Sequence, residues 1–484
     1  MDEPLLLGLD LGTTNAKAAV YDRQGSLVAE SSAAYATDYP QPGWAEQRPA
    51  DWLRALTTAC RQLMHQLGPR RQELVGIGLA AHGPGLVLVD RQGQPLLDTS
   101  PTWQDTRCLA QAEHLLAVAG PYPTGMGLPH NTFLAKLLWV CEHNPAIARR
   151  THVALGVKDY LAHWLTGEFV TEPSTNAGAQ IWPQTVVAAC GWSVDRLAQV
   201  VASTDQIGPL LPTRAEALGL PVGLPVVIGL NDGASATLSM GAIQPHEMVL
   251  TLATSGVLRV VLHDPIAPQT QLDHKLFAWP YVPGRSIAGG HIRLGASALS
   301  WFADTHWTGH ADGNYIGVLA EVATSPPGSR GVIFLPYLLG RGGPQADDAA
   351  QGGFLGLTFA TTRADLARAV LEGVAFAFRE LLDDFAGMGY VPPLIRISGG
   401  GARSELWRQI LADVLNCPLA YFTADSTLGA AMMAAVGVGI YANCNPAVDA
   451  MVHAPEITEP HLQHQAVYAD AYRHYQYLRD RLFA

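Results

Sequence analysis

The sequence predicts an α/β protein with more than one domain. Short apolar runs typical of buried strands alternate along the chain with segments whose apolar residues recur at helical spacing, and this alternation characterises the α/β class. A chain of 484 residues is too long for one ordinary hydrophobic core. A strand–turn–strand pattern near the start recurs halfway along, which suggests that one architecture is used twice.

The recurring pattern is a pair of apolar runs joined by a polar tip. It first occurs in LLLGLDLGTTNAKAAVYD, residues 5–22, and again in EMVLTLATSGVLRVVLHD, residues 247–264. Each stretch predicts a β-hairpin of two buried strands. Because one hairpin opens each half of the chain, we expect a domain boundary near residues 241–247, with domains 1–245 and 246–484.

Three segments have clear helical spacing. Apolar residues fall on one face from Asp51 onward, and Gly68 is a typical helix terminator. Thr362 and Asp365 have the spacing of a capping box ahead of a long apolar stripe. A third stripe, residues 407–415, follows the segment LIRISGGGARSE, which predicts a strand, a glycine-rich turn and a helix.

The first hairpin tip carries groups suited to phosphate and metal. Gly12 lets backbone approach a ligand closely, and the amides and hydroxyls of Thr13 and Thr14 can donate to phosphate oxygens. Asp10 is the kind of hard oxygen ligand that Mg²⁺ prefers, and Lys17 could add a positive charge. The alternative is an ordinary hairpin with a polar turn.

Two further segments strengthen the phosphate hypothesis. Thr254 and Ser255, followed by Gly256, place similar donors on the second hairpin tip. The glycines of residues 399–401 would let a planar group such as adenine pack flat against backbone. A tight strand–helix turn is the alternative there, but two such hairpins and one such turn in this order are improbable by accident.

Asp232 is the candidate catalytic residue. It follows an apolar strand, residues 225–230, and precedes a helix of small residues in GLNDGASATLSMGA. In phosphoryl transfer from ATP to a hydroxyl group, a carboxylate so placed can orient the hydroxyl and accept its proton. The alternative is that Asp232 only caps the helix.

Several polar residues between the two hairpins could line a sugar pocket. Each alone is explained by structure, as a turn histidine, a half-buried tryptophan or a capping side chain. Together they indicate a substrate site. They are His82, Trp103, Asp105 and Asn176.

Charge and cysteine content limit the partners and the compartment. The formal net charge of −12 argues against nucleic acid or an anionic membrane surface as the main partner. The six cysteines form no C-x-x-C pair, and the N-terminal residues lack the positive charge of a signal peptide. The longest run of small apolar residues is also too short to span a membrane. A cytoplasmic protein is expected.

Other known nucleotide-binding motifs are absent from the sequence. It contains no Gly-Lys of a Walker loop and no complete G-x-G-x-x-G fingerprint.

Taken together, these segments resemble the FGGY family of carbohydrate kinases, and within it the xylulose kinases. The resemblance covers nearly the whole chain, and no single motif carries it. The matching segments are GLDLGTTNAKAAVYD, HG after GIGLAA, TWQDTR, KLLWVCEHNP, KDYLAHWLTGEF, GLNDGASATLSMGA, TSGVLRVV, FLPYLLGRGGP, GFLGLTFATTRADLARAVLEGVAFAFRELLDDF and ISGGGARSELWRQILADVLNCPL. The sequence departs from the family pattern at Ala81, where a methionine is usual, and at Ala253, where a glycine is usual. After PYL the family usually has Gly-Glu-Arg, and this chain has Gly340, Arg341 and Gly342.

The resemblance implies two actin-like (ribonuclease H-like) ATPase domains with ATP, Mg²⁺ and a sugar in the cleft between them. It implies that Asp232 is the catalytic base and that Asp10 serves the metal. The residues it assigns to ATP are Gly12, Thr13, Thr14, Lys17, Thr254, Ser255, Gly256, Gly399, Gly400, Gly401 and Ala402. The residues it assigns to the sugar are His82, Trp103, Asp105, Asn176 and Asp232.

The expected reaction is phosphorylation of a small open-chain sugar, D-xylulose first. Ribulose and gluconate kinases of the same family remain alternatives. A nucleotide-gated actin-like ATPase or binding protein without sugar kinase activity is the alternative from another class, and a catalytically dead sugar sensor is a third. A homodimer is a family-level expectation.

Overall fold

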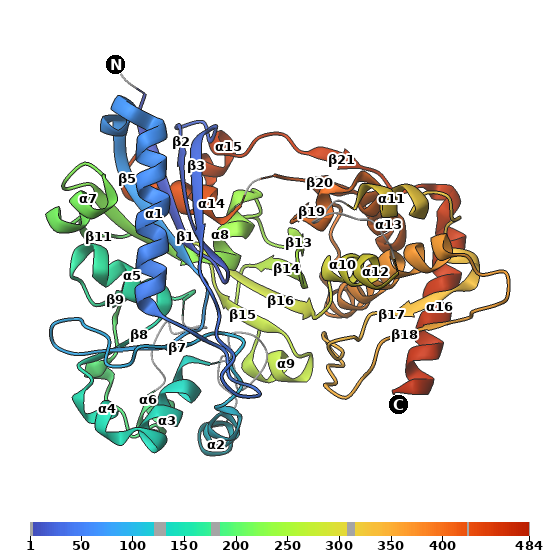
Figure 1. Cartoon of the computed structure of the whole chain (residues 1–484), viewed down its shortest axis with the longest axis horizontal. Helices are drawn as coiled ribbons and strands as arrows, with labels where there is room; N and C mark the ends of the chain where they lie inside the picture. Colours follow the sequence, from blue (N-terminus) through green and yellow to red (C-terminus); the bar gives the residue numbers. More distant parts are fainter. Residues whose placement is uncertain (1–2, 121–131, 176–183, 307–314, 424, 484) are drawn as a thin grey trace.

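Two large mixed β-sheets form the frame of the molecule (Figure 1). The computed structural model describes residues 3–120, 132–175, 184–306, 315–423 and 425–483. The first sheet has the strand order β11-β12-β5-β1-β2-β3. Its strands are β1 (Leu5–Leu11), β2 (Asn15–Tyr21), β3 (Leu27–Ala34), β5 (Leu74–Ala81), β11 (Gln206–Pro209) and β12 (Pro225–Asn231).

The second sheet has seven strands in the order β15-β16-β14-β13-β19-β20-β21. They are β13 (Met248–Leu252), β14 (Gly256–Leu262), β15 (Phe277–Pro280), β16 (Ser286–Ile292), β19 (Ile395–Ser398), β20 (Leu419–Tyr421) and β21 (Glu456–Thr458). Four short pairs lie outside the two sheets: β4 (Glu46–Gln47) with β7 (Ser100–Pro101), β6 (Val87–Val89) with β8 (Val153–Leu155), β9 (Val170–Thr171) with β10 (Gln199–Val200), and β17 (Ile333–Leu335) with β18 (Gly353–Leu355).

The two sheets share one topology over six strands. In the first, β1 pairs antiparallel with β2 and β2 with β3, while β5 and β12 continue on the other side in parallel and β11 closes the edge antiparallel. In the second, β13, β14 and β16 repeat the antiparallel meander, and β19, β20 and β21 repeat the other side. This agreement confirms that one architecture is used twice.

Helices pack on both sheets, on the short β6–β8 pair and on one another. They are α1 (Pro49–Leu67), α2 (Leu109–Ala119), α3 (Phe133–His143), α4 (Pro145–Arg150), α5 (Val157–Thr166), α6 (Gln184–Ala189), α7 (Pro212–Leu218), α8 (Asp232–Ser239), α9 (Pro268–Asp273), α10 (Ser297–His306), α11 (Ile316–Val322), α12 (Arg363–Gly387), α13 (Glu405–Leu415), α14 (Ser426–Gly437), α15 (Cys444–Met451) and α16 (Gln465–Leu482). Within the described residues, none is both long and apolar enough to cross a membrane.

The predicted helices and their end signals are confirmed. Helix α1 ends at the residue before Gly68 and buries the apolar face that the sequence predicts. At the start of α12, Thr362 and Asp365 form the reciprocal capping box, with the Thr362 hydroxyl accepting from the Asp365 amide and the Asp365 carboxylate accepting from the Thr362 amide. Helix α13 follows the strand β19 and its glycine-rich turn.

Four clusters of buried apolar side chains hold the described elements together, and one of them joins α2, α3 and α6 to the β6–β8 pair. Helices α1, α5 and α7 pack on one face of the first sheet, and α10, α12, α13 and α16 pack on the outer face of the second. The remaining faces of both sheets share one core with α8, α14 and α15, in which Leu6 and Val227 of the first sheet lie with Val249 and Ile287 of the second. The two halves are therefore joined by a common hydrophobic core.

Helix α14 belongs to the second half of the chain but lies on the first sheet. It packs against β1, β5 and β12 as well as α8. Glycines make this approach possible, because a Cβ on Gly8 would lie 2.0 Å from the carbonyl oxygen of Thr427 and one on Gly78 would lie 1.8 Å from that of Ala430. The last strand of the first sheet ends at Asn231 and the first strand of the second begins at Met248, so the expected boundary lies between the two sheets, whereas α14 comes later in the sequence and covers the first sheet.

Gly78→Ala tests this close packing. The added methyl group has no room against the α14 backbone, so we expect the free energy of unfolding to fall by about 1–3 kcal/mol or more, as in other overpacked interiors. Gly387→Ala, at the end of α12 where a Cβ would meet nothing within 4 Å, is the matched control. Urea unfolding midpoints of the two variants measure the difference. Equal midpoints would contradict the packing role of Gly78.

Candidate active site

Two carboxylates from different elements lie close together where the two halves meet. Asp10 stands near the end of β1, and Asp232 is the first residue of α8. Burial, reinforced by the negative charge of Asp232, raises the pKa of Asp10 to about 7. Its Oδ2 accepts a hydrogen bond of 2.6 Å from the Ser426 hydroxyl, and its buried Oδ1 has no partner among the described residues.

Asp232 does not serve as the cap of its helix. That role belongs to Asn231, whose side-chain oxygen accepts from the Ala234 amide at 2.8 Å. Asp232 is half-buried, and its Oδ1 accepts from the Gly233 amide at 2.7 Å. Burial raises the pKa of Asp232 to about 6, against the opposing effects of the Gly233 amide and the charge of Arg259. Helix capping therefore does not account for the presence of Asp232 at this position.

Arg259 is a site residue that sequence reasoning missed. It lies on β14 with a buried side chain, and a Cβ on Gly233 would be 3.0 Å from its Nη2. Nη1 donates to the Thr251 hydroxyl at 3.0 Å, while Nε has no partner among the described residues. Burial lowers the pKa of Arg259 to about 10, opposed by the charge of Asp232. The one available signal was a lone arginine in an otherwise apolar strand.

The first hairpin tip is held rigidly by side chains from elsewhere. The indole Nε1 of Trp103 donates to the Thr13 hydroxyl at 3.0 Å, and Gln47 donates to the Thr13 carbonyl at 2.6 Å. The Tyr35 hydroxyl donates to the Gly12 carbonyl. Thr14 is exposed. Trp103, expected at the sugar, thus directly contacts the tip expected at phosphate.

Lys17 is engaged by the start of α14. Its Nζ lies 2.8 Å from the carboxylate of Asp425, which also caps α14 by accepting from the amide and hydroxyl of Thr427. The charge of Lys17 and these hydrogen bonds outweigh the effect of burial and lower the pKa of Asp425. Asp425 and Ser426 were not predicted. Helices α8 and α14 both begin at this junction, and helix N-termini favour anions.

The second hairpin tip places Thr254 at the surface and Ser255 half-buried. Its main chain is held by the loop after β16, because the amides of Gly295 and Ala296 donate to the carbonyls of Thr254 and Ala253 at 2.9 and 2.6 Å. Gly256 is buried, and a Cβ there would lie 2.3 Å from the ring of Phe378. The structure thus requires Gly256 for packing.

The glycine-rich turn after β19 has one open position. A Cβ on Gly400 would meet nothing within 4 Å, whereas one on Gly399 would lie 2.5 Å from the Leu252 carbonyl oxygen and one on Gly401 would lie 2.6 Å from the Leu252 side chain. Ala402 is fully buried. A ligand therefore has room to approach the backbone at Gly400.

The imidazole ring of His82 has no hydrogen-bond partner among the described residues. Its side chain is buried, both ring nitrogens lack a partner among the described residues, and its ring lies edge-on to Trp52 with centroids 5.8 Å apart. Burial, with a smaller effect of the nearby Lys136 charge, lowers the pKa of His82 to about 4. The imidazole is therefore neutral at physiological pH and can both donate and accept a hydrogen bond.

Asp105 is buried and already bonded. Its Oδ1 and Oδ2 accept from the Arg107 guanidinium at 2.8 and 2.6 Å, and Oδ2 also accepts from the Ala45 amide at 2.8 Å. The Arg107 guanidinium in turn lies 3.6 Å from the centroid of the Trp44 ring. Asn176, the remaining sugar candidate, lies outside the described residues.

Comparison with known families decides the class of protein. Residues 5–239 match the N-terminal domain of the FGGY family of carbohydrate kinases, and residues 248–438 match its C-terminal domain. The chain belongs to the FGGY family of carbohydrate kinases. The two sheets with their repeated topology are the two-domain, actin-like ATPase fold of that family. As a sugar kinase, the protein uses ATP as the phosphoryl donor.

Individual relatives cover nearly the whole kinase. The xylulose kinase of Escherichia coli (strain K12) is 33% identical over 447 residues, which is 89% of this chain and 90% of the relative. A gluconokinase of Bacillus licheniformis is 28% identical, with 90% and 87% of the two chains covered. The crystal structure of xylulose kinase from Rhodospirillum rubrum superposes with a TM-score of 0.87 at 29% identity, covering 99% of each chain.

Proposed function

We propose that this kinase transfers the γ-phosphoryl group of Mg²⁺-ATP to the terminal hydroxyl of D-xylulose, forming D-xylulose 5-phosphate. The observation that carries the proposal is Asp232, a half-buried carboxylate with a pKa raised to about 6 at the junction of the two halves. A base with this pKa is ionised at neutral pH and still accepts a proton readily. Relatives that are xylulose kinases support the choice of sugar.

In this mechanism Asp232 orients the sugar hydroxyl and accepts its proton as the hydroxyl oxygen attacks the γ-phosphorus. General-base help of this kind contributes about 10²–10⁴-fold to the rate. Arg259 beside it stabilises the ionised carboxylate before the proton moves. Helices α8 and α14 both begin at this junction, and the positive ends of their dipoles would favour the transferring phosphoryl group.

The acidic pair fits a magnesium ion. Asp10 has a buried oxygen without a partner among the described residues, and burial together with repulsion from Asp232 raises its pKa, two effects that a divalent cation would offset. Carboxylate oxygens are the ligands Mg²⁺ prefers, usually alongside water and phosphate. Asp10 would hold the ion, and Ser426 fixes the orientation of its carboxylate. When bound, the ion neutralises charge on the nucleotide phosphates.

ATP would lie across both halves. Thr13 and Thr14 on the first tip, with Thr254 and Ser255 on the second, would donate to the phosphates, and the open backbone at Gly400 would receive the adenosine. Lys17 would act through its ion pair with Asp425, which fixes the start of α14.

The sugar would lie between His82, Trp103 and Asp232. The neutral His82 imidazole has two unsatisfied ring nitrogens, and binding a sugar hydroxyl would remove the cost of leaving them buried without partners. Asp105 already accepts hydrogen bonds from Arg107, so it would shape the wall of the sugar pocket mainly by holding Arg107 in place.

A panel of acceptors tests the proposed reaction. Coupled measurement of ADP release with Mg²⁺-ATP should show turnover with D-xylulose above D-ribulose, L-ribulose, gluconate and glycerol. Asp232→Ala should lower kcat by about 10²–10⁴-fold because it removes the proton acceptor. No comparable loss should occur in Asp90→Ala, which removes a half-buried carboxylate from a turn of the same half. Turnover with gluconate alone would refute D-xylulose as the substrate, and unchanged kcat in Asp232→Ala would refute the base.

Arg259→Leu gives a pH-dependent prediction. Asp232 must be ionised to accept a proton, so kcat/KM should fall as the pH drops through the pKa of Asp232, about 6. The charge of Arg259 lowers that pKa, so removing it should move the acidic limb of the profile upward by about one pH unit or more. Arg259→Lys, which keeps the charge, should restore most of the wild-type profile. Coincident acidic limbs in wild type and Arg259→Leu would show that the guanidinium has no such effect.

A further inference from the structure

A second cluster of polar side chains lies in the helical layer of the second half, away from β1 and α8. Asp413 lies on α13. His461 precedes the 3₁₀ turn η5 (Leu462–His464), which leads into α16, and His464 is the last residue of that turn. One ligand atom from each of the three residues can be chosen so that all lie within 4.8 Å of one another. His464 Nδ1 is 2.7 Å and His461 Nδ1 is 3.5 Å from the same oxygen, Asp413 Oδ2.

The local fold explains why the two imidazoles converge. In a 3₁₀ helix, side chains at positions i and i+3 eclipse one another, so His461 and His464 project from one side of the turn. Their rings lie 5.0 Å apart between centroids. The spacing of the two histidines in the motif H-L-Q-H is therefore enough to place two imidazole nitrogen ligands side by side.

The carboxylate is oriented for the imidazoles. Asp413 Oδ1 accepts from the Gln409 side-chain amide at 2.9 Å and from the His461 backbone amide at 2.7 Å. These bonds fix the carboxylate and leave Oδ2 facing the two rings, and the side chain is only 1% exposed. Such outer hydrogen bonds are the usual way in which a metal ligand is held in orientation.

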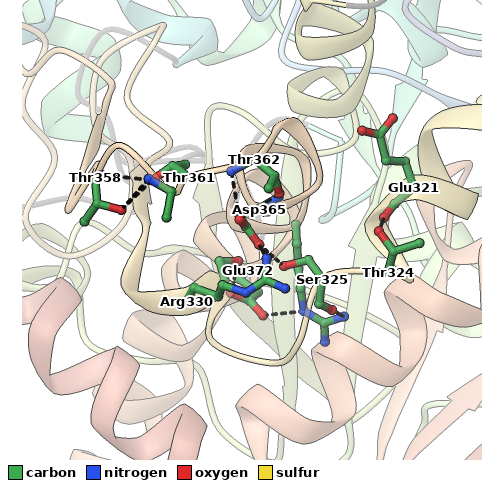
Figure 2. A network of polar contacts seen from close by, with 12 residues as sticks. Glu321, Thr324, Ser325, Arg330, Thr358, Thr361, Thr362, Asp365 and Glu372 are labelled. Carbon is green, nitrogen blue, oxygen red and sulfur yellow. Dashed lines mark hydrogen bonds and ion pairs between the residues drawn. The ribbon is translucent and has the colours of Figure 1, made fainter.

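The three residues share the wall of a cavity of about 510 Å³, which also borders Thr324, Ser325, Gln409 and others. A cavity provides an entry path and an open coordination position. Two guanidinium groups, of Arg330 and Arg368, also border it, but each is neutralised: Arg330 lies 2.7 Å from Asp365, and Arg368 lies 2.8 Å from Glu372. Figure 2 shows Arg330 beside Asp365 and Glu372.

We propose that Asp413, His461 and His464 bind a divalent transition-metal ion of the Zn²⁺ type. Two imidazoles and one carboxylate suit such ions, whereas Mg²⁺ prefers oxygen ligands alone. Ligand atoms about 2.0–2.2 Å from a tetrahedral zinc ion lie roughly 3.3 Å apart, and the distances of 2.7 and 3.5 Å bracket that value. The ion takes the place of any proton on the two Nδ1 atoms, and each released proton goes to solvent while Nε2 keeps its hydrogen.

The bound ion would link α13 to the start of α16. It would therefore stabilise the docking of the C-terminal helix, in addition to the buried tyrosines that α16 contributes to the core. Because the folded chain alone assembles the three ligands, saturating metal should raise the unfolding temperature by mass action.

The test uses the untagged full-length protein after chelator treatment, with Co²⁺ as a spectroscopic probe and Zn²⁺ as competitor. We expect one Co²⁺ per chain with visible absorption bands of imidazole coordination, lost on adding Zn²⁺. His461→Gln changes a half-exposed ring and should weaken Zn²⁺ binding at least about 10-fold, since even outer partners of a metal ligand cost that much.

His474→Gln is the matched control, because it removes an exposed histidine on α16 outside the cluster and should bind as wild type does. A His461→Gln/His464→Gln double variant covers the case in which one ring compensates for the other, and Asp413→Asn covers the carboxylate. Absence of Co²⁺ bands in the wild type, or bands of equal affinity in the double variant, would overturn the proposal. These readouts involve neither ATP nor sugar, so they stand apart from the test of the kinase reaction.

Discussion

The close seating of α14 on the first sheet is the constraint on which the site depends. Gly8 and Gly78 leave room for the helix backbone to approach β1 and β5 within a distance that any Cβ would block. This contact brings Ser426, from the last fifth of the chain, to the carboxylate of Asp10 near its start. Asp232, the first residue of α8, and Ser426, the first residue of α14, therefore both lie near Asp10, so the proposed site draws on both halves of the chain.

The buried charged groups at this site have shifted pKa values, and burying them lowers the stability of the folded protein. Burial raises the pKa values of Asp10 and Asp232 to about 7 and 6, so each ionised carboxylate is less stable here than it would be in water. Arg259 is buried beside them with its own pKa lowered to about 10. Groups perturbed in this way cluster at functional sites because a poised base or metal ligand must be partly removed from water. A magnesium ion would supply positive charge to offset the two carboxylates.

Sequence patterns predicted what depends on nearby residues. Both hairpins, the capping box at Thr362 and the strand–helix junction that carries Asp232 follow from local periodicity and turn chemistry, and all are present. The missed residues are those defined by distant contacts. Lys17 and Asp425 are 408 positions apart, and Ser426 is 416 from Asp10, so neither pairing leaves a local signal.

A similar limit applies to the sugar wall. The residue type of Asp105 suggested a ligand contact, but its neighbours Arg107 and Ala45 occupy its carboxylate in a way that only the fold reveals. The roles assigned to His82, Trp103 and Asn176 stay predictions.

A crystal structure with Mg²⁺, a non-hydrolysable ATP analogue and D-xylulose is the most direct test of the proposed site. We expect the terminal sugar hydroxyl within about 2.6–3.2 Å of the Asp232 carboxylate, with the γ-phosphate between the two hairpin tips. A sugar bound away from Asp232, or a nucleotide that avoids Asp10 and both tips, would contradict it.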